Sequence, residues 1–154
     1  MRIAILDDWE RAALASADWS ELRRDCQIVV FNEPIADRAE LIRKLADCQA
    51  VCLMRERTQF PAAVIEALPQ LRLIVTTGMR NGAIDLAAAT RRGIVVSGTR
   101  GSSGSTCELT WGLILAATRH IPAADARLRQ GRWTVPMGMG LEGRTLGVVG
   151  LGRI

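Results

Sequence analysis

Short apolar runs that alternate with amphipathic stretches dominate the first two thirds of the 154-residue chain. The runs are apolar throughout rather than at every second position, which is typical of strands buried on both faces. Strands of this kind, separated by helices, form a parallel sheet covered on both sides. The expected strands are Arg2–Leu6, Gln27–Phe31, Ala50–Met54, Leu71–Thr76 and Ile94–Val96.

Capping residues predict four helices between these strands. Aspartate accepts hydrogen bonds from the free N–H groups at a helix start, proline fits the first turn, and glycine ends a helix. The expected helices are Trp19–Arg24 with Asp18 as N-cap, Arg38–Ala46 with Asp37 as N-cap, Ala62–Leu68 with Pro61 at position N1, and Leu86–Arg92 with Asp85 as N-cap and Gly93 as the C′ residue. The pattern predicts a compact, flavodoxin-like α/β unit.

The last third begins with a hinge and continues into one long helix. Glycine and serine dominate Ser97–Ser105, which predicts a loop. A helix is expected from about Thr106 to Gln130, kinked or split at Pro122 and ended by Gly131. Its apolar stripe needs burial and consists of Leu109, Leu113, Ala117, Ile121, Ala124 and Leu128. We therefore expect one domain over residues 1–100, and an inter-domain helix with the start of a second domain over residues 101–154.

The final residues match the opening of a dinucleotide-binding turn. Arg144–Gly150 is expected to be a strand, and Gly150–Ile154 then supplies the first five positions of a G-x-G-x-x-G motif. The third glycine would be the next residue. Taken alone, a G-x-G after two valines is a weak signal, and a plain glycine turn is the alternative. The α/β unit upstream favours the first strand of a truncated Rossmann domain.

Two loops at the expected carboxyl edge of the sheet are candidates for ligand binding, because open α/β sheets bind ligands beyond the carboxyl ends of their strands. In Thr76–Asp85, Gly78 and Gly82 permit positive φ, so successive N–H groups can converge on an anion. A plain turn, with Asp85 acting only as a cap, is equally favoured by the residue types. In Met54–Thr58, Arg55 can grip a carboxylate, although a surface Arg–Glu pair is the stronger interpretation.

Two further residues could suggest acid–base chemistry, but the spacing favours neither. No carboxylate lies at a sequence spacing that would identify it as a partner of His120. A solvent-facing histidine or one at a helix terminus is therefore expected. Glu108 lies near a helix start, where a carboxylate stabilises the helix by itself.

Composition argues against nucleic-acid and membrane partners. The net charge is +4, and 19 of the 20 basic residues are arginines spread along the chain without a dense basic run. No apolar run approaches the ~18 residues of a membrane span, and the N-terminus lacks the apolar region of a signal peptide. The four cysteines contain no C-x-x-C pair and there is one histidine. We expect reduced thiols in the cytoplasm and no metal site.

The order of several segments resembles a known family. The α/β unit is followed by Thr76–Asp85 (TTGMRNGAID), Arg91–Val96 (RRGIVV), Ser105–Thr110 (STCELT), a long helix, Gly131–Trp133 (GRW) and Leu146–Ile154 (LGVVGLGRI). This order is similar to the N-terminal half of the D-isomer-specific 2-hydroxyacid dehydrogenases, the group that includes the phosphoglycerate dehydrogenases. The resemblance covers essentially all of the chain.

The resemblance implies a substrate site. In the family, the loop that matches Gly78, Met79 and Arg80 holds the substrate carboxylate through backbone N–H groups, and the arginine that matches Arg55 faces the substrate. The substrate would be a small D-2-hydroxy acid or the corresponding 2-oxo acid. Arg80 departs from the family pattern, which often has glycine there, so its side chain would narrow the pocket or add a charge.

The resemblance also implies a cofactor, NAD or NADP with NAD favoured, and a homodimeric full-length protein. The segment that matches Ser105 and Thr106 lies near the nicotinamide. The phosphate loop corresponds to Gly150, Gly152, Arg153 and Ile154. The family's catalytic arginine, glutamate and histidine lie beyond Ile154, so we expect no activity from this chain alone. The alternative is a non-catalytic, cofactor-sensing or protein-interaction module of the same fold.

Overall fold

The computed structural model describes residues 1–101, 104–150 and 152. The chain divides into two compact units, Met1–Gly101 and Ser102–Ile154. Each unit is described by itself below.

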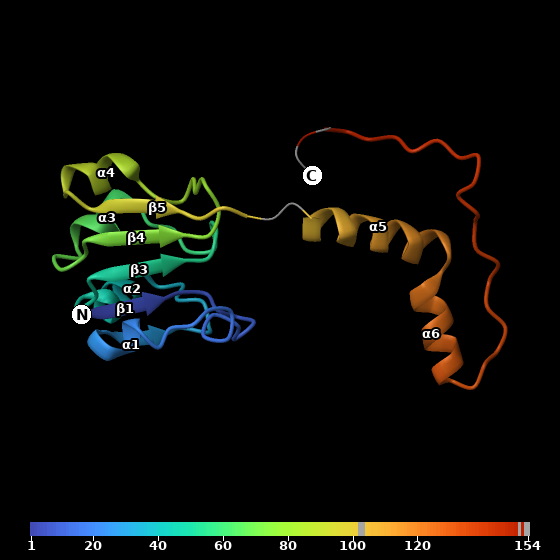
Figure 1. The fold of residues 1–154 in the computed structure, drawn as a ribbon, viewed down its shortest axis with the longest axis horizontal. Coiled ribbons are helices and arrows are strands. Elements are labelled where there is room, and N and C mark those ends of the chain that lie inside the picture. The colour runs from blue at the N-terminus through green and yellow to red at the C-terminus, as the bar shows by residue number, and fades with distance from the viewer. Residues whose placement is uncertain (102–103, 151, 153–154) are drawn as a thin grey trace. The chain divides into compact units, whose positions relative to one another are not determined.

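A five-stranded parallel sheet forms the centre of the first unit (Figure 1). Its strands are β1 (Arg2–Ile5), β2 (Gln27–Val30), β3 (Ala50–Leu53), β4 (Leu73–Thr76) and β5 (Val95–Gly98). Their order across the sheet is β2-β1-β3-β4-β5, which is the order of flavodoxin-like folds. The predicted fold class is confirmed.

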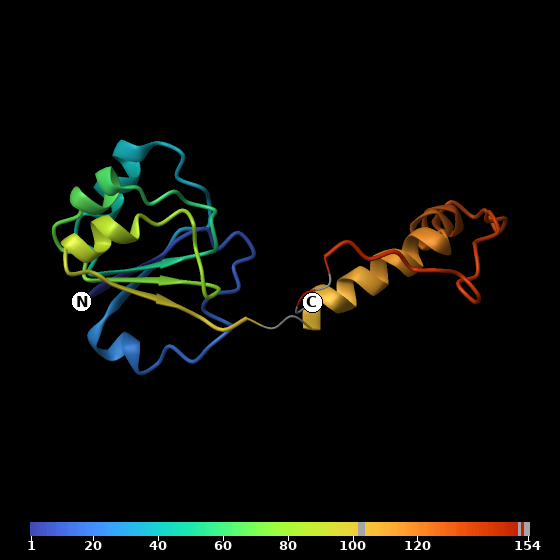
Figure 2. The ribbon, with the colours of Figure 1, turned by 90° about the horizontal axis from the view of Figure 1, so that it is seen from above.

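The helices of the first unit divide between the two faces of the sheet. They are α1 (Leu22–Asp25), α2 (Arg38–Leu45), α3 (Ala62–Glu66) and α4 (Leu86–Arg91). Helices α2, α3 and α4 cover one face, and α1 lies on the other (Figure 2). This division follows from the strand order. The step from β1 to β2 runs across the sheet in the opposite direction to the later steps, and right-handed crossovers then place its helix on the opposite face.

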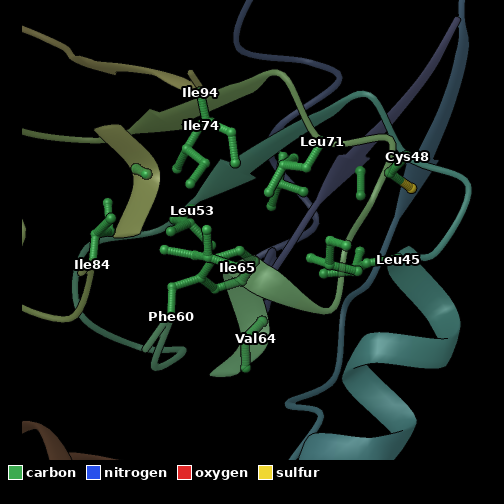
Figure 3. Close-up of a cluster of buried hydrophobic side chains, with 14 of the residues drawn as sticks. Leu45, Cys48, Leu53, Phe60, Val64, Ile65, Leu71, Ile74, Ile84 and Ile94 are labelled. Atoms are coloured by element: carbon green, nitrogen blue, oxygen red, sulfur yellow. The ribbon is translucent and has the colours of Figure 1, made fainter. Parts of the chain in front are cut away.

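The hydrophobic core lies between the sheet and helices α2 to α4 (Figure 3). Alternate residues of the central strands point into it, including Val51, Leu53 and Ile74, and each is at most 2% exposed. Phe60, in the loop before α3, and Ile65 of α3 are fully buried against them. Because this core is continuous beneath β3 and β4, the loops that follow these two strands start from a rigid base.

Of the four predicted helix starts, two are confirmed and two are wrong, and Gly93 follows the C-cap of α4 with φ +64° as predicted. Asp37 accepts a hydrogen bond from the N–H of Glu40 at 2.8 Å, and Asp85 accepts one from Ala88 at 2.9 Å. Asp18 instead binds the N–H of Ser20 in a local turn, and α1 begins only at Leu22. Pro61 is the N-cap of α3 rather than its first residue.

The fifth strand is displaced from its predicted position by about one residue at its start. It runs from Val95 to Gly98 because Val95 pairs with Leu73 and Gly98 with Thr76 of β4. The strand thereby carries Ser97 and Gly98, which the composition had assigned to a hinge. The backbone pairing with β4 overrides the low strand propensity of these two residues.

In the described part of the second unit there are two helices, α5 (Gly104–Thr118) and α6 (Ile121–Arg129). The predicted split of the long helix is confirmed, but the break lies at His120, which has a left-handed backbone with φ +53°. Pro122 is in the first turn of α6, where a missing N–H costs nothing. Apolar side chains are exposed around α5 rather than along one stripe: Leu109, Trp111, Leu113 and Leu115 are all at least 43% exposed. Within residues 1–101, 104–150 and 152, no helix combines the length and apolar character that a membrane crossing requires.

The prediction of a strand over Arg144–Gly150 is wrong. This segment has an irregular backbone, and Val149 is completely exposed. A strand is held by hydrogen bonds to a neighbouring strand, and among the described residues none pairs with this segment. The valines have strand propensity, but no ladder of hydrogen bonds reaches them from the described residues.

Candidate functional site

The loops that follow β1, β3, β4 and β5 meet at the carboxyl edge of the sheet. Two of them contain the residues predicted to bind substrate: Arg55 lies in the loop after β3, and Gly78, Met79 and Arg80 lie in the loop after β4. Because β3 and β4 are parallel neighbours in register, their ends are side by side and the two loops are in contact.

The main chain of Arg55 has a left-handed conformation with φ +52°, which few non-glycine residues adopt. Its N–H donates to the hydroxyl of Thr77 at 3.0 Å, and its carbonyl accepts from the Asn81 amide at 2.6 Å. The guanidinium lies against Gly78, since a Cβ built on Gly78 would be 2.5 Å from Arg55 Nη1. In the part of the chain that the structure describes, the Arg55 side chain has no ion pair and no hydrogen bond.

The loop after β4 is fixed between Arg55 and the end of β5. Gly78 has φ +94°; its N–H donates to the Thr99 hydroxyl at 3.0 Å, and its carbonyl accepts from the Thr99 N–H at 3.2 Å. Gly98 has to lack a side chain, because a Cβ there would be 2.7 Å from the Gly78 carbonyl oxygen. The Gly78 amide is therefore already bonded to Thr99 at the end of β5.

The amides of Met79 and Arg80 are not engaged in the same way as that of Gly78. Met79 and Arg80 are exposed, and among the described residues their backbone N–H groups have no acceptor. Gly82 does not have the positive φ that we expected, and a Cβ on it would contact nothing within 4 Å. Asn81 explains the difference, because its side chain binds the N–H of Ala83 and shapes the turn with an ordinary backbone at Gly82.

Sequence reasoning favoured a surface Arg–Glu pair for Arg55. Among the described residues Arg55 forms none, and Arg57 instead pairs with Glu10 of the loop after β1. The Arg57 guanidinium binds both carboxylate oxygens of Glu10, at 3.0 and 3.2 Å, and the Asp7 carbonyl at 2.8 Å. It also stacks over the Trp9 ring at 4.0 Å from the centroid. Hydrogen bonding to Arg57 lowers the pKa of the Glu10 carboxyl. Arg57 is thus engaged within the protein, which leaves Arg55 as the available cation of this loop.

A buried carboxylate at the end of β1 was missed by sequence reasoning. Asp7 is 2% exposed, has φ +58°, and accepts a hydrogen bond from the Thr58 hydroxyl at 2.6 Å. The signal was an acidic pair directly after a buried strand, but Thr58 is 51 residues away. The bond ties the loop after β1 to the loop that carries Arg55. Among the described residues, no group of three or more His, Cys, Asp and Glu side chains is placed to hold a metal ion.

The residues predicted to bind the cofactor lie in the second unit. Ser105 and Thr106 are exposed in the first turn of α5. Gly150 has φ +81°, a conformation that glycine adopts without strain, and Gly152 is exposed. Arg153 and Ile154 lie outside the described residues. His120 is exposed and its side chain caps nothing. Since no strand precedes Gly150 here, the described residues do not form a dinucleotide site by themselves.

Comparisons with known proteins agree with this architecture. Residues 3–144 match the model of the D-isomer specific 2-hydroxyacid dehydrogenase catalytic domain. The chain is 39% identical over 137 residues to D-3-phosphoglycerate dehydrogenase of Homo sapiens, an alignment that covers 87% of this chain and 26% of the human enzyme. The chain therefore belongs to the D-isomer specific 2-hydroxyacid dehydrogenase family.

Two solved structures extend the comparison. The phosphoglycerate oxidoreductase from Vibrio cholerae has a TM-score of 0.87 and 37% identity, covering 99% of this chain and 50% of that one. The NADPH-dependent glyoxylate/hydroxypyruvate reductase from Sinorhizobium meliloti, solved in complex with NADP and malonate, has a TM-score of 0.66 and 26% identity, covering 99% and 46%. This chain thus spans half or less of the length of these relatives.

Proposed function

We propose that the first unit is the substrate-binding domain of an NAD(P)-dependent oxidoreductase that interconverts small D-2-hydroxy acids and 2-oxo acids. The observation that carries this proposal is the environment of Arg55. Its guanidinium has no partner among the described residues, rests against Gly78, and adjoins a loop in which the Met79 and Arg80 amides have no acceptor. An unpaired cation beside free N–H donors is the arrangement that a carboxylate needs.

The residues of this chain bind and orient the acid. The Arg55 fork binds one carboxylate bidentately, and the exposed amides of Met79 and Arg80 donate to its oxygens. The carboxylate is fixed at the carboxyl ends of β3 and β4. The C2 atom of the acid then points away from Arg55, where the cofactor can reach it. The nicotinamide, when bound, supplies or accepts the hydride at C2. Proton transfer and orientation of the carbonyl belong to the histidine, glutamate and arginine that the family carries in its later half.

The substitution Arg55→Ala tests this function in the complete enzyme. A charge-assisted contact contributes ~1.5–3 kcal/mol, so kcat/KM for a 2-oxo acid should fall roughly tenfold to a hundredfold with little change in cofactor affinity. Arg55→Lys should recover only part of the loss, because an ammonium cannot form the fork. Arg72→Ala is the matched control. Arg72 is also exposed, but it directly precedes β4 and so lies at the amino ends of the strands, away from the candidate site. Unchanged kinetics in Arg55→Ala would show that Arg55 is an ordinary surface residue.

We further propose that NAD, in preference to NADP, is the cofactor, contacted by Ser105, Thr106, Gly150 and Gly152. The exposed apolar side chains of α5 support a homodimer of the full-length protein, because such a surface is stabilised by burial. The isolated chain should bind a 2-oxo acid without reducing it. Oxidation of NADH by the purified chain would contradict the proposal that this chain binds the acid while the later half of the protein carries the catalytic residues.

A further inference from the structure

We propose that Thr77 and Asn81 are positioning residues that hold Arg55 in its left-handed conformation and thereby aim its guanidinium at the Gly78 loop. The proposal rests on the substrate-binding function given above. Neither residue is assigned to contact the acid. Each acts on the backbone of Arg55, and so determines where the side chain of Arg55 points.

The two backbone polar groups of Arg55 are both bound by side chains of the neighbouring loop. Thr77 Oγ1 accepts from the Arg55 N–H at 3.0 Å, and Asn81 Nδ2 donates to the Arg55 carbonyl at 2.6 Å. A left-handed backbone is unfavourable for arginine, so it persists only where the surroundings impose it. These two hydrogen bonds are the constraint that the structure provides.

Asn81 is suited to this role because both polar atoms of its side-chain amide form hydrogen bonds. The residue is 9% exposed. Its Nδ2 donates to the Thr76 hydroxyl at 2.8 Å as well as to Arg55, and its Oδ1 accepts from the Ala83 N–H at 2.9 Å. The carbonyl of Arg55 and the N–H of Ala83 fix which way the amide is turned. An aspartate would place an oxygen against the Arg55 carbonyl and could not substitute.

Thr77 holds the other side of Arg55 through its hydroxyl group. The hydroxyl contacts Met54 Sδ at 3.3 Å, so donating its proton to sulfur leaves a lone pair for the Arg55 N–H. Serine retains this acceptor, whereas valine has the same shape without it.

The arrangement links the two halves of the anion site. Thr77 and Asn81 flank the segment that carries the Met79 and Arg80 amides, so the same loop that supplies the amides also orients the arginine. The distance between the guanidinium and the amides is therefore fixed by one loop. A site for a single planar carboxylate requires such a fixed distance.

The experiment uses the 154-residue chain labelled with ¹³C and ¹⁵N, and pyruvate as the probe. Backbone chemical shifts and the HN–Hα coupling of Arg55 report its φ angle directly, whether or not pyruvate binds. The variants are Asn81→Ala, Thr77→Val and Thr77→Ser. Asn32→Ala is the control, because the Asn32 amide also binds a loop carbonyl, that of Asp8, at 2.8 Å but does not touch Arg55.

We expect Asn81→Ala and Thr77→Val to release Arg55 from the left-handed region and to weaken pyruvate binding about tenfold, as the loss of one charge-assisted contact does. Thr77→Ser and Asn32→Ala should change neither property. In an Arg55→Ala background, Thr77→Val should cause no further loss of affinity.

The proposal is overturned if Arg55 keeps its left-handed φ in both Asn81→Ala and Thr77→Val, whatever happens to binding. If Asn81→Ala does not fold, the comparison of Thr77→Val with Thr77→Ser decides the question. If Arg55 leaves the left-handed region in these variants but the wild-type chain binds no pyruvate, the positioning of Arg55 stands and the proposed function fails.

Discussion

Replacement of Gly98 by alanine tests the close contact between the end of β5 and the Gly78 loop. A Cβ at position 98 would be 2.7 Å from the Gly78 carbonyl oxygen and 3.0 Å from Met79 Cα. Both are backbone atoms, so no side chain can rotate out of the way and the loop itself has to move by several tenths of an ångström. Overpacking of this kind costs about 1–3 kcal/mol. We expect Gly98→Ala to destabilise the first unit by that amount and to weaken pyruvate binding, because Gly78 supports the Arg55 guanidinium.

Urea unfolding followed through NMR signals of the sheet strands measures this loss in the first unit alone. Gly82→Ala is a matched control in the same region, since its φ is not positive and a Cβ there would meet nothing within 4 Å. Alanine at such a site reduces the entropy of the unfolded chain, so Gly82→Ala should be unchanged or more stable by up to ~1 kcal/mol. If Gly98→Ala unfolds at the same urea concentration as the wild type and Gly82→Ala, the inferred packing of the loop is wrong.

Three further predictions concern other contacts. Thr58→Val should destabilise the first unit by about 1–3 kcal/mol, because the buried Asp7 carboxylate loses its donor, and Thr58→Ser should recover most of this in the same urea assay. The Glu10 carboxyl should titrate by NMR below the ordinary pKa of 4.5 and return to it in Arg57→Ala; its contact with Arg57 is complete above the ordinary pKa and is lost as the pH falls through the lowered one. A thiol reagent should modify the exposed Cys107 before Cys48 and Cys52, whose pKa values are raised by burial; faster loss of a buried thiol would contradict the fold.

Features set by local sequence were predictable. Asp37 and Asp85 each precede a helix and cap it through a residue three positions later. The five strands followed from short apolar runs, because a strand covered on both faces has no polar side. The errors occurred where tertiary contacts decide: β5 extends through Ser97 and Gly98 because it pairs with β4. Arg144–Gly150, with valines that favour a strand, has no described partner and remains irregular.

For the candidate site, too, the sequence predicted local features but not the tertiary contacts. The position of Arg55 beside Gly78 could be anticipated, because parallel strands end at one edge of the sheet. The bonds that fix these residues could not, since Thr99 is 21 residues from Gly78 and Asn81 is 26 from Arg55. The pairing of Arg57 with Glu10 spans 47 residues, so nothing in the local sequence distinguished the engaged arginine from the free one.

The most direct test of the central claim is a pyruvate titration of the ¹⁵N-labelled chain that locates the bound carboxylate. The account predicts saturable shifts at the backbone amides of Met79 and Arg80 and at Arg55 Nε. In Arg55→Ala the shifts of Met79 and Arg80 should require roughly tenfold to a hundredfold more pyruvate. The Gly78 amide, already bonded to Thr99, should move less. An absence of shifts at these positions, or shifts confined to a different surface, would contradict the assignment of this loop pair as the carboxylate site.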